Sequence, residues 1–318
     1  VAVAAGTDWA SLSEEMIYEP LGMTSTSSRH ADYMARVNRA ASHVPGAGGY
    51  VVSDRRQPDA QSPAGGVSSS VNDMARWMAM VLDGGQVGAT RLLSAAALSP
   101  ALSPQMITGA PRDVSARAGT YGFGFNVGTR PTGRVMLSHS GAFSLGASTS
   151  IAMIPDLDLG IVVLTNAPPV GAAEAITASF LDRSEIGIDS RDWLDAYGPL
   201  MAALSAPVGQ LVGVEPPRDA APAKPSDEYA GRYGNAYFGP ATVTASDDGL
   251  SLRLGPADGE LPMTHWDGNV FVVHPISENQ PAGSISRVAF FEDPSGNIVE
   301  MRIEHLNENG LGSFLVLE

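Results

Sequence analysis

The chain contains 318 residues, with no cysteine and a formal net charge of −15 at pH 7. This length predicts two domains with a hydrophobic core in each, and 44% apolar with 17% charged residues is typical of a globular protein. The lack of cysteine excludes disulfides and thiolate metal sites. The acidic balance argues against nucleic acid or an anionic membrane as a partner, and no apolar run reaches the ~18 residues of a membrane span.

Helical patterns occupy four places before residue 206. Thr7 or Asp8 can cap a first helix, which cannot continue through Pro20. Ser70 begins a second helix, because Asp73 follows three residues later as in a capping box. The apolar stripe of this second helix consists of Val71, Met74, Met78, Val81 and Leu82, and Gly84-Gly85 ends it. The last two helices are predicted at 172–181 and 192–204.

Strand patterns separate the second and third helices, at 134–138, 147–154 and 159–165. A glycine-rich turn and then residues 155–158 lie between them, so an antiparallel meander is expected. His139, Ser140 and Gly141 stand at the end of the first strand. Cleft walls of acyl-transfer enzymes need polar groups beside backbone that a substrate can approach closely. The His-x-Gly pattern is by itself a weak signal.

The sequence changes character after residue 205. Residues 206–225 are rich in proline and have little periodicity, which predicts a linker along the surface. Beyond it, apolar and polar residues alternate in runs such as 250–254 and 299–303. Such short strands predict a small antiparallel barrel or sandwich over residues 226–318. This part holds 14 acidic and 4 basic residues, which favours solubility over recognition of a basic segment.

Four ordered segments carry a family resemblance that covers roughly residues 3–182. They are residues 18–26, 63–76 and 121–125, and the hairpin Pro155, Asp156, Gly160, Val162, Val163, Leu164, Thr165 and Asn166 that follows His139-Ser140-Gly141. With these flanks the chain resembles the serine β-lactamase and penicillin-binding-protein-like hydrolases, in their class C-like, esterase and D-aminopeptidase branch. In that family the third active-site motif is Lys-Thr-Gly or His-x-Gly on a strand at the edge of the sheet.

The resemblance implies an α+β fold for residues 1–205, the C-terminal part of the β-lactamase/DD-peptidase-like fold, with an antiparallel sheet and flanking helices. Residues 226–318 resemble, more loosely, the lipocalin-like β-barrel that is often appended to this family. The implied activity is cleavage of an ester, amide or peptide bond through an acyl-enzyme, with no cofactor and no metal site. The family resemblance also implies a periplasmic or secreted location, and a cytoplasmic one stays open.

Six residues are candidates for the implied site. The resemblance gives His139 a hydrogen bond to the acyl or carboxylate end of the substrate, and the backbone N–H of Ala142 a place in the oxyanion hole. A lysine in place of His139 would be fully charged at neutral pH, so recognition of a substrate carboxylate is in doubt. For the other four residues a structural role is the alternative to substrate binding: Ser140 at the strand edge, Gly141 in a turn, and Tyr121 and Phe143 in the core.

The family's first two motifs are missing. The only lysine is Lys224, and Ala221 lies three positions before it, so the chain contains no Ser-x-x-Lys. The only Tyr-x-Asn, Tyr233 to Asn235, follows the third motif and is rejected as the second one. We therefore expect the nucleophile on an N-terminal segment of the same protein that precedes Val1, in cis or as a second chain, and no activity from this chain alone. Without that segment, the apolar faces around Met74, Met78 and Val81 should be uncovered.

Two other functions stay open. The chain could be a non-catalytic relative that binds peptide or peptidoglycan fragments. It could also be a binding protein centred on the barrel, with the first domain as a scaffold. His265 and His274, in the second domain, are interpreted as residues of the strand surface because their spacing suits no metal site.

Overall fold

The computed structural model describes residues 1–255 and 259–317, so residues 256–258 and Glu318, the last residue of the predicted barrel domain, lie outside the described part. The chain divides into two compact units, Val1–Ser205 and Ala206–Glu318. No helix among the described residues is long and apolar enough to cross a membrane.

The first unit is built on a six-stranded antiparallel sheet with the order β10-β9-β8-β7-β6-β5. Its strands are β5 (Met106–Gly109), β6 (Gly119–Tyr121), β7 (Asn126–Thr129), β8 (Val135–Phe143), β9 (Ala147–Ile154) and β10 (Leu159–Thr165). Two short hairpins accompany the sheet, β1 (His43–Gly46) with β2 (Gly49–Val52), and β3 (Gln86–Val87) with β4 (Thr90–Arg91). The predicted meander is confirmed in β8, β9 and β10.

Two helices of this unit begin at predicted capping residues, and a third is capped by Asp192, the first residue of the helix predicted at 192–204. Asp8, Ser70 and Asp192 each accept a backbone N–H three residues later, and so begin α2, α5 and α8. The helices are α1 (Ala2–Ala5), α2 (Trp9–Ser13), α3 (His30–Ala35), α4 (Ser62–Gly65), α5 (Val71–Leu82), α6 (Ala95–Leu98), α7 (Ala172–Ile186) and α8 (Trp193–Leu204). A π-helical turn, Glu14–Tyr18, follows α2, and short 3-10 turns cover Asp59–Gln61 and Pro155–Leu157.

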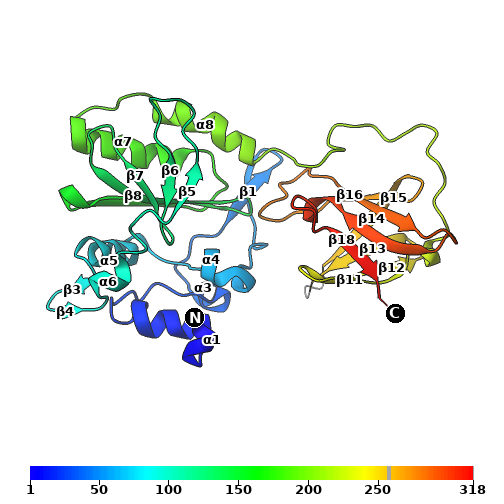
Figure 1. The fold of residues 1–318 in the computed structure, drawn as a ribbon, viewed down its shortest axis with the longest axis horizontal. Helices are drawn as coiled ribbons and strands as arrows, with labels where there is room; N and C mark the ends of the chain where they lie inside the picture. The colour runs from blue at the N-terminus through cyan, green and yellow to red at the C-terminus, as the bar shows by residue number, and fades with distance from the viewer. Residues whose placement is uncertain (256–258, 318) are drawn as a thin grey trace. The chain divides into compact units, whose positions relative to one another are not determined.

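Helices α5 and α7 cover opposite faces of the sheet (Figure 1). Successive side chains of a strand point to opposite faces. On β9, Ile151 and Met153 pack in the cluster that contains Met78 and Val81 of α5. Ala152 and Ile154 pack instead in the cluster of α7, against Leu181. The parity of a residue on β8 or β9 therefore tells which face of the sheet its side chain occupies.

Two expectations for this unit are corrected. The first strand does not end at Ser138, because β8 continues to Phe143 and pairs with β9 throughout, from His139↔Ile151 to Phe143↔Ala147. The helix face is also better covered than expected: Met78 and Val81 are only 6% and 4% exposed, because the sheet packs on them. Met74 is the member of the three that lines an open groove.

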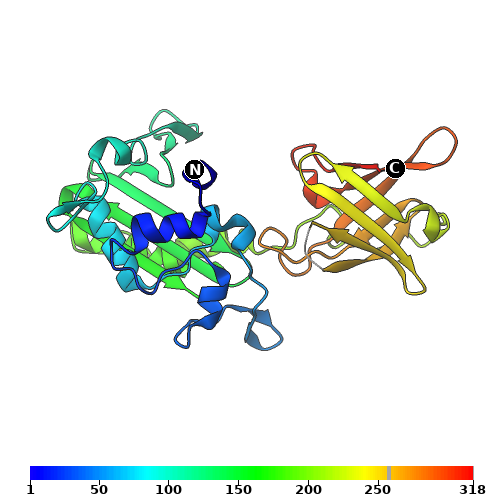
Figure 2. The ribbon, with the colours of Figure 1, turned by 90° about the horizontal axis from the view of Figure 1, so that it is seen from below.

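The second unit is a closed antiparallel barrel with the order β11-β12-β13-β14-β15-β16-β17-β18 (Figure 2). Its strands are β11 (Gly231–Asn235), β12 (Gly239–Ser246), β13 (Gly249–Leu254), β14 (Glu260–Asp267), β15 (Val270–Val273), β16 (Ser286–Glu292), β17 (Ile298–Ile303) and β18 (Ser313–Val316). Short 3-10 turns cover Ser226–Glu228 and Glu304–Leu306. Pairing of Tyr233 with Val316 closes the barrel and removes its strand edges.

Large side chains fill the interior of the barrel. Tyr229, Tyr233, Phe314 and Met301 are all at most 2% exposed, and they belong to one core cluster. The hydroxyl of Tyr229 donates to Asn269 Oδ1 at 2.6 Å, and that of Tyr233 donates to the Tyr229 carbonyl at 2.6 Å. Burial raises the pKa of Tyr233 to about 12. The barrel thus resembles a lipocalin in shape, and these buried side chains form its core.

Residues 206–318 are expected to unfold in one cooperative transition when produced alone. Their core cluster contains residues of the second unit only, and the closed ladder leaves no strand that needs a partner from elsewhere. Thermal unfolding followed by circular dichroism and by tyrosine fluorescence should give coincident curves. Two separate transitions, or binding of a dye specific for exposed apolar surface at room temperature, would contradict an autonomous domain.

Candidate active site

The predicted motif lies where strand β8 extends beyond the end of its neighbour β7. Strand β7 pairs with β8 only up to Ser138, whereas β9 accompanies β8 to Phe143. From His139 onward, the edge of β8 that faces β7 is therefore left without a strand. Backbone groups along such an edge are available to another chain or to a ligand.

The backbone N–H groups of Ser140 and Ala142 point to this free edge. The side-chain amide of Asn126 donates to the Ser138 carbonyl, which therefore faces β7. In an antiparallel strand the N–H and C=O of one residue point to the same side, and the side alternates along the strand. Ser140 and Ala142 have the same parity as Ser138, so their N–H groups face away from β9. This placement fits a backbone donor for a substrate carbonyl.

His139 is held in a defined orientation at this edge. Its Nδ1 lies 2.8 Å from the Gly124 carbonyl oxygen and 3.2 Å from the hydroxyl of Tyr121. A carbonyl can only accept, so Nδ1 carries the hydrogen and Nε2 of the neutral ring is left with its lone pair. The side chain is exposed. Tyr121 and His139 are thus brought together, with ring centroids 6.3 Å apart.

The side chain of Ser140 occupies the opposite face of the sheet. Its hydroxyl donates to Oε1 of Glu174 on α7 at 2.5 Å and lies 3.2 Å from the Thr149 carbonyl. Glu174 is only 6% exposed, and its Oε2 is buried without a hydrogen-bond partner among the described residues. Burial raises the pKa of Tyr197 on α8, and the charge of Glu174 raises it further. The side chain of Ser140 thus points toward α7. Its contact with substrate stays a prediction.

Gly141 is required by close packing inside the strand. A Cβ at this position would lie 2.6 Å from Thr149 Oγ1 and 2.8 Å from the ring of Phe143. The ring of Phe143 packs against Arg56, whose guanidinium carbon lies 4.2 Å from the ring centroid. Gly141 therefore belongs to the ladder between β8 and β9 and not to a turn.

A groove of about 980 Å³ opens on the same face of the sheet as the side chain of His139. Its apolar lining includes Ile17, Met74, Trp77, Ile151 and Leu164. Four arginines also line it, Arg29, Arg36, Arg39 and Arg56. Thr149 and Ile151 line it and pair with Gly141 and His139 on β8. None of the six predicted site residues, all of them described by the structure, is among the lining residues. We call this feature the sheet groove.

Sequence reasoning missed two neighbours of the motif, Glu174 and Arg56. Each is far from residues 139–143 in sequence, so only the packing of the folded chain reveals the contact. The segments that supply the sheet groove likewise extend from Trp9 to Asn166. Among the described residues, no group of three or more His, Cys, Asp or Glu side chains could hold a metal ion.

Comparison with known proteins gives two family matches. The family model named Beta-lactamase matches residues 1–182, and a domain of unknown function (DUF3471) matches residues 215–311. A curated relative, Unguisins hydrolase ungD of Aspergillus violaceofuscus, is 27% identical over 296 residues. This match covers 83% of the chain and 49% of the relative, so the chain spans about half the length of that protein.

Solved structures of penicillin-binding proteins and β-lactamases are also similar. The C-terminal domain of a penicillin binding protein is 38% identical, with a TM-score of 0.29, over 35% of this chain and 99% of that one. An octameric penicillin-binding protein homologue from Pyrococcus abyssi is 17% identical, with a TM-score of 0.48, over 94% and 59%. A class C β-lactamase from Rhodobacter sphaeroides is 21% identical, with a TM-score of 0.42, over 54% and 53%.

The family model supplies the identification. It matches 182 of the 318 residues, and the matched part contains the whole meander of β8, β9 and β10 together with α5. The chain therefore belongs to the Beta-lactamase family of serine hydrolases.

Proposed function

We propose that this chain is part of a serine hydrolase that cleaves an ester, amide or peptide bond through an acyl-enzyme. The serine nucleophile, its lysine and the proton-carrying tyrosine would come from an N-terminal segment of the same protein outside residues 1–318, since the chain has no Ser-x-x-Lys. The observation that supports the proposal is the free edge of β8, which carries both the Ala142 N–H and the His139 ring that the Gly124 carbonyl holds.

The reaction assigns a separate task to each group at this edge. When the serine oxygen attacks the substrate carbonyl carbon, negative charge develops on the carbonyl oxygen, and the Ala142 N–H would donate to it. The leaving group departs with a proton, and water later attacks the acyl-enzyme and releases the acid. His139, held through Nδ1 by Gly124, offers Nε2 as an acceptor when neutral and as a donor when protonated. Gly141 and Tyr121 would support this geometry.

The apolar lining of the sheet groove supports the proposal that an N-terminal segment completes the site. Its wall includes Met74, Trp77 and Ile151, apolar side chains on the face of the sheet to which His139 points. Apolar surface of this kind favours cover by another part of the protein. A helix that carries the serine and the lysine would cover these side chains and bring both groups to the strand edge. The curated relative ungD is named a hydrolase, which agrees with the proposed reaction type, although this chain spans only about half of its length.

Residues 1–318 alone are expected to show no turnover of a nitrophenyl acyl ester, because the remaining groups can only orient and polarise the substrate. The full-length protein, or this chain mixed with its N-terminal segment, should release nitrophenolate with an initial burst that reports acyl-enzyme formation. A fluorophosphonate probe should label the full-length protein on serine and leave residues 1–318 unlabelled.

Two results would decide against this function. Turnover by pure residues 1–318 would show that the nucleophile lies within the chain. A full-length protein that binds peptide or peptidoglycan fragments but resists the probe would instead favour a non-catalytic binding relative. The matched control for turnover is an Ala variant of the nucleophilic serine of the N-terminal segment, which removes the serine and preserves the fold.

A further inference from the structure

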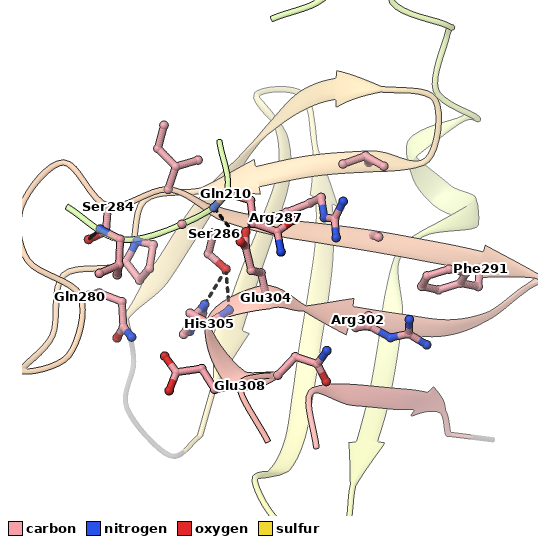
Figure 3. Close-up of a pocket in the computed structure, with 17 residues that line it drawn as sticks. Gln210, Gln280, Ser284, Ser286, Arg287, Phe291, Arg302, Glu304, His305 and Glu308 are labelled. Atoms are coloured by element: carbon pink, nitrogen blue, oxygen red, sulfur yellow. Dashed lines mark hydrogen bonds between the residues drawn. The ribbon is translucent and has the colours of Figure 1, made fainter. Parts of the chain in front are cut away.

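A second hollow of about 470 Å³ lies on the outer surface of the barrel (Figure 3). Its floor is a row of side chains across three strands, because Val270 of β15 pairs with Ala289 of β16, and Ala289 with Arg302 of β17. The segment 208–210 forms one wall, and residues that follow β17 form another. We call this hollow the barrel groove; it is independent of the site on β8.

The wall formed by residues 208–210 is tied to the barrel. Val208 donates its N–H to Ser284 Oγ at 3.1 Å, and its carbonyl accepts from Ile285 at 3.0 Å. Gly209 permits this approach: its φ is 125°, and a Cβ there would lie 1.7 Å from the Ile285 carbonyl oxygen. The N–H of Gln210 donates to Glu304 at 2.7 Å. A wall anchored through Val208 and Gln210 makes the groove a preformed feature of the barrel.

His305 presents a hydrogen-bond donor at one end of the barrel groove. Its backbone N–H donates to Ser286 Oγ at 3.2 Å, and its ring Nδ1 lies 2.7 Å from the same oxygen. Ser286 is only 2% exposed, so its hydroxyl needs a hydrogen-bond acceptor within the protein. His305 Nδ1 is the acceptor within reach, and the hydroxyl therefore donates to it. Nε2 then keeps its hydrogen. Burial lowers the pKa of His305 to about 4, which leaves the ring neutral at pH 7.

Two more donors of the barrel groove have no partner in the described part of the chain. Gln280 is only 8% exposed, and its Oε1 accepts the Ser277 hydroxyl, which leaves the amide nitrogen unused. The guanidinium of Arg287 makes no hydrogen bond or ion pair within residues 1–255 and 259–317. The carboxylate of Glu304 is already used, because its oxygens accept the N–H groups of Gln210 and Arg287 at 2.7 and 2.9 Å.

The remaining charges give the groove two unlike ends. Figure 3 shows Gln280, His305 and Glu308 toward one end, Arg302 and Phe291 toward the other, and Arg287 between them. Arg302 is already paired with Glu300 at 2.7 Å and lies over the ring of Phe291. Val208, Ile285 and Ala289 add apolar surface between the two ends. The unused polar groups are thus mostly donors beside apolar surface, and the one unused acid is the exposed Glu308.

We propose that the barrel groove binds a small organic carboxylate with an apolar or aromatic body. The carboxylate would accept from Arg287, with the donors of His305 and Gln280 toward the neighbouring end of the groove, and the apolar body covers Ile285 and Ala289. A volume of about 470 Å³ is in the range of small-molecule sites. The acidic surface of the module repels anions in general, so binding depends on these local donors and on the apolar contact together.

The test is an NMR titration of residues 1–318 with three probes: 4-phenylbutyrate, 4-phenylbutylamine with the same body, and inorganic phosphate. 4-Phenylbutyrate should shift the imidazole signals of His305 saturably, with a dissociation constant in the millimolar range or tighter. His265 and His274, in the same unit but outside the groove, serve as internal controls. The amine and phosphate should leave His305 unshifted.

Arg287→Gln should weaken 4-phenylbutyrate binding about tenfold or more, the usual size of a lost hydrogen bond to a charged group. Arg287 is exposed, so this variant should fold as the parent does. The matched control is Arg253→Gln, an exposed arginine of β13 outside the groove, which should bind as the parent does. No saturable shift, equal binding of the amine, preference for phosphate, or an Arg287→Gln variant with unchanged affinity would each overturn the proposal.

Discussion

His139→Ala is expected to lower the turnover of the complete enzyme by ~10²–10³, the usual effect of losing one fixed donor or acceptor at the reacting centre. The ring is oriented by Gly124 through Nδ1, so Nε2 is preorganised before the substrate arrives. His139 is exposed, and its removal should shift the melting temperature by a few degrees at most. Burst kinetics with a nitrophenyl ester and thermal unfolding measure the two effects. His274→Ala, an exposed histidine of the barrel, is the matched control and should change neither.

His139→Lys is the sharper test, because it recreates the Lys-x-Gly form of the motif. The exposed strand edge has room for a longer side chain, so the variant should fold. A permanent positive charge there should shift the preference of the enzyme toward substrates with a free carboxylate. The ratio of kcat/KM for an acidic and a neutral ester of the same acyl group is the measurement. A ratio identical to that of the parent would place His139 outside the substrate site.

Local signals in the sequence predicted part of the secondary structure, namely helices α2, α5, α7 and α8 and strands β8, β9, β10, β13 and β17. The side chains of Asp8 and Ser70 start their helices as expected, because a cap acts within one turn of the chain. Alternation in 250–254 and 299–303 predicted strands that the structure places in β13 and β17. Period-two patterns are local as well, so they can be recognised without knowledge of the strand partner.

Other features depend on contacts between residues that are distant in the sequence, so they could not be predicted from local patterns. The end of β8 is set by pairing with β9, and the sequence 139–143 alone resembles a turn. The contact of Ser140 with Glu174 joins residues 34 positions apart. Closure of the barrel requires Tyr233 and Val316 to meet, and neither residue carries a signal for the other. The candidate site was therefore predicted as a motif, while its free edge and its buried neighbour required the fold.

Arg130→Met is expected to destabilise the first unit by about 3 kcal/mol, near the lower end for breaking a buried ion pair. The guanidinium donates to Asp182 at 2.8 Å and to Glu185 at 2.7 Å, and the three side chains are 13%, 6% and 1% exposed. Removing the cation leaves two buried carboxylates. The loss is moderated because Arg134 lies 3.6 Å from Glu185 and Ser190 still donates to Asp182. Methionine retains most of the apolar contact of the arginine side chain.

The expected fall in melting temperature is roughly 6–12 °C for a unit of this size. The matched control is Arg183→Met, which breaks an ion pair with Asp189 at 2.6 Å. Arg183 is 67% exposed, so water replaces the lost partner and the melting temperature should hardly change. Equal effects of the two variants would show that burial does not decide the strength of these pairs. An unchanged melting temperature in Arg130→Met would show that the ion pairs of Arg130 do not stabilise the fold.

The stability of the fold at low pH should depend on the same ion pairs. Burial alone would raise the pKa of Asp182, but hydrogen bonds from Ser190, Arg130 and Trp193 outweigh it and lower the pKa from 3.8 to about 2. A carboxyl with a lower pKa in the folded state stabilises the fold above its unfolded pKa, and this stability is lost as the pH falls from about 4 toward 2. Urea unfolding of the parent should weaken across this interval. In Arg130→Met one of the donors is gone, so the pKa of Asp182 should rise and the dependence on pH in this interval should become shallower. A slope as steep as in the parent would mean that Ser190 and Trp193, and not Arg130, set the charge of Asp182.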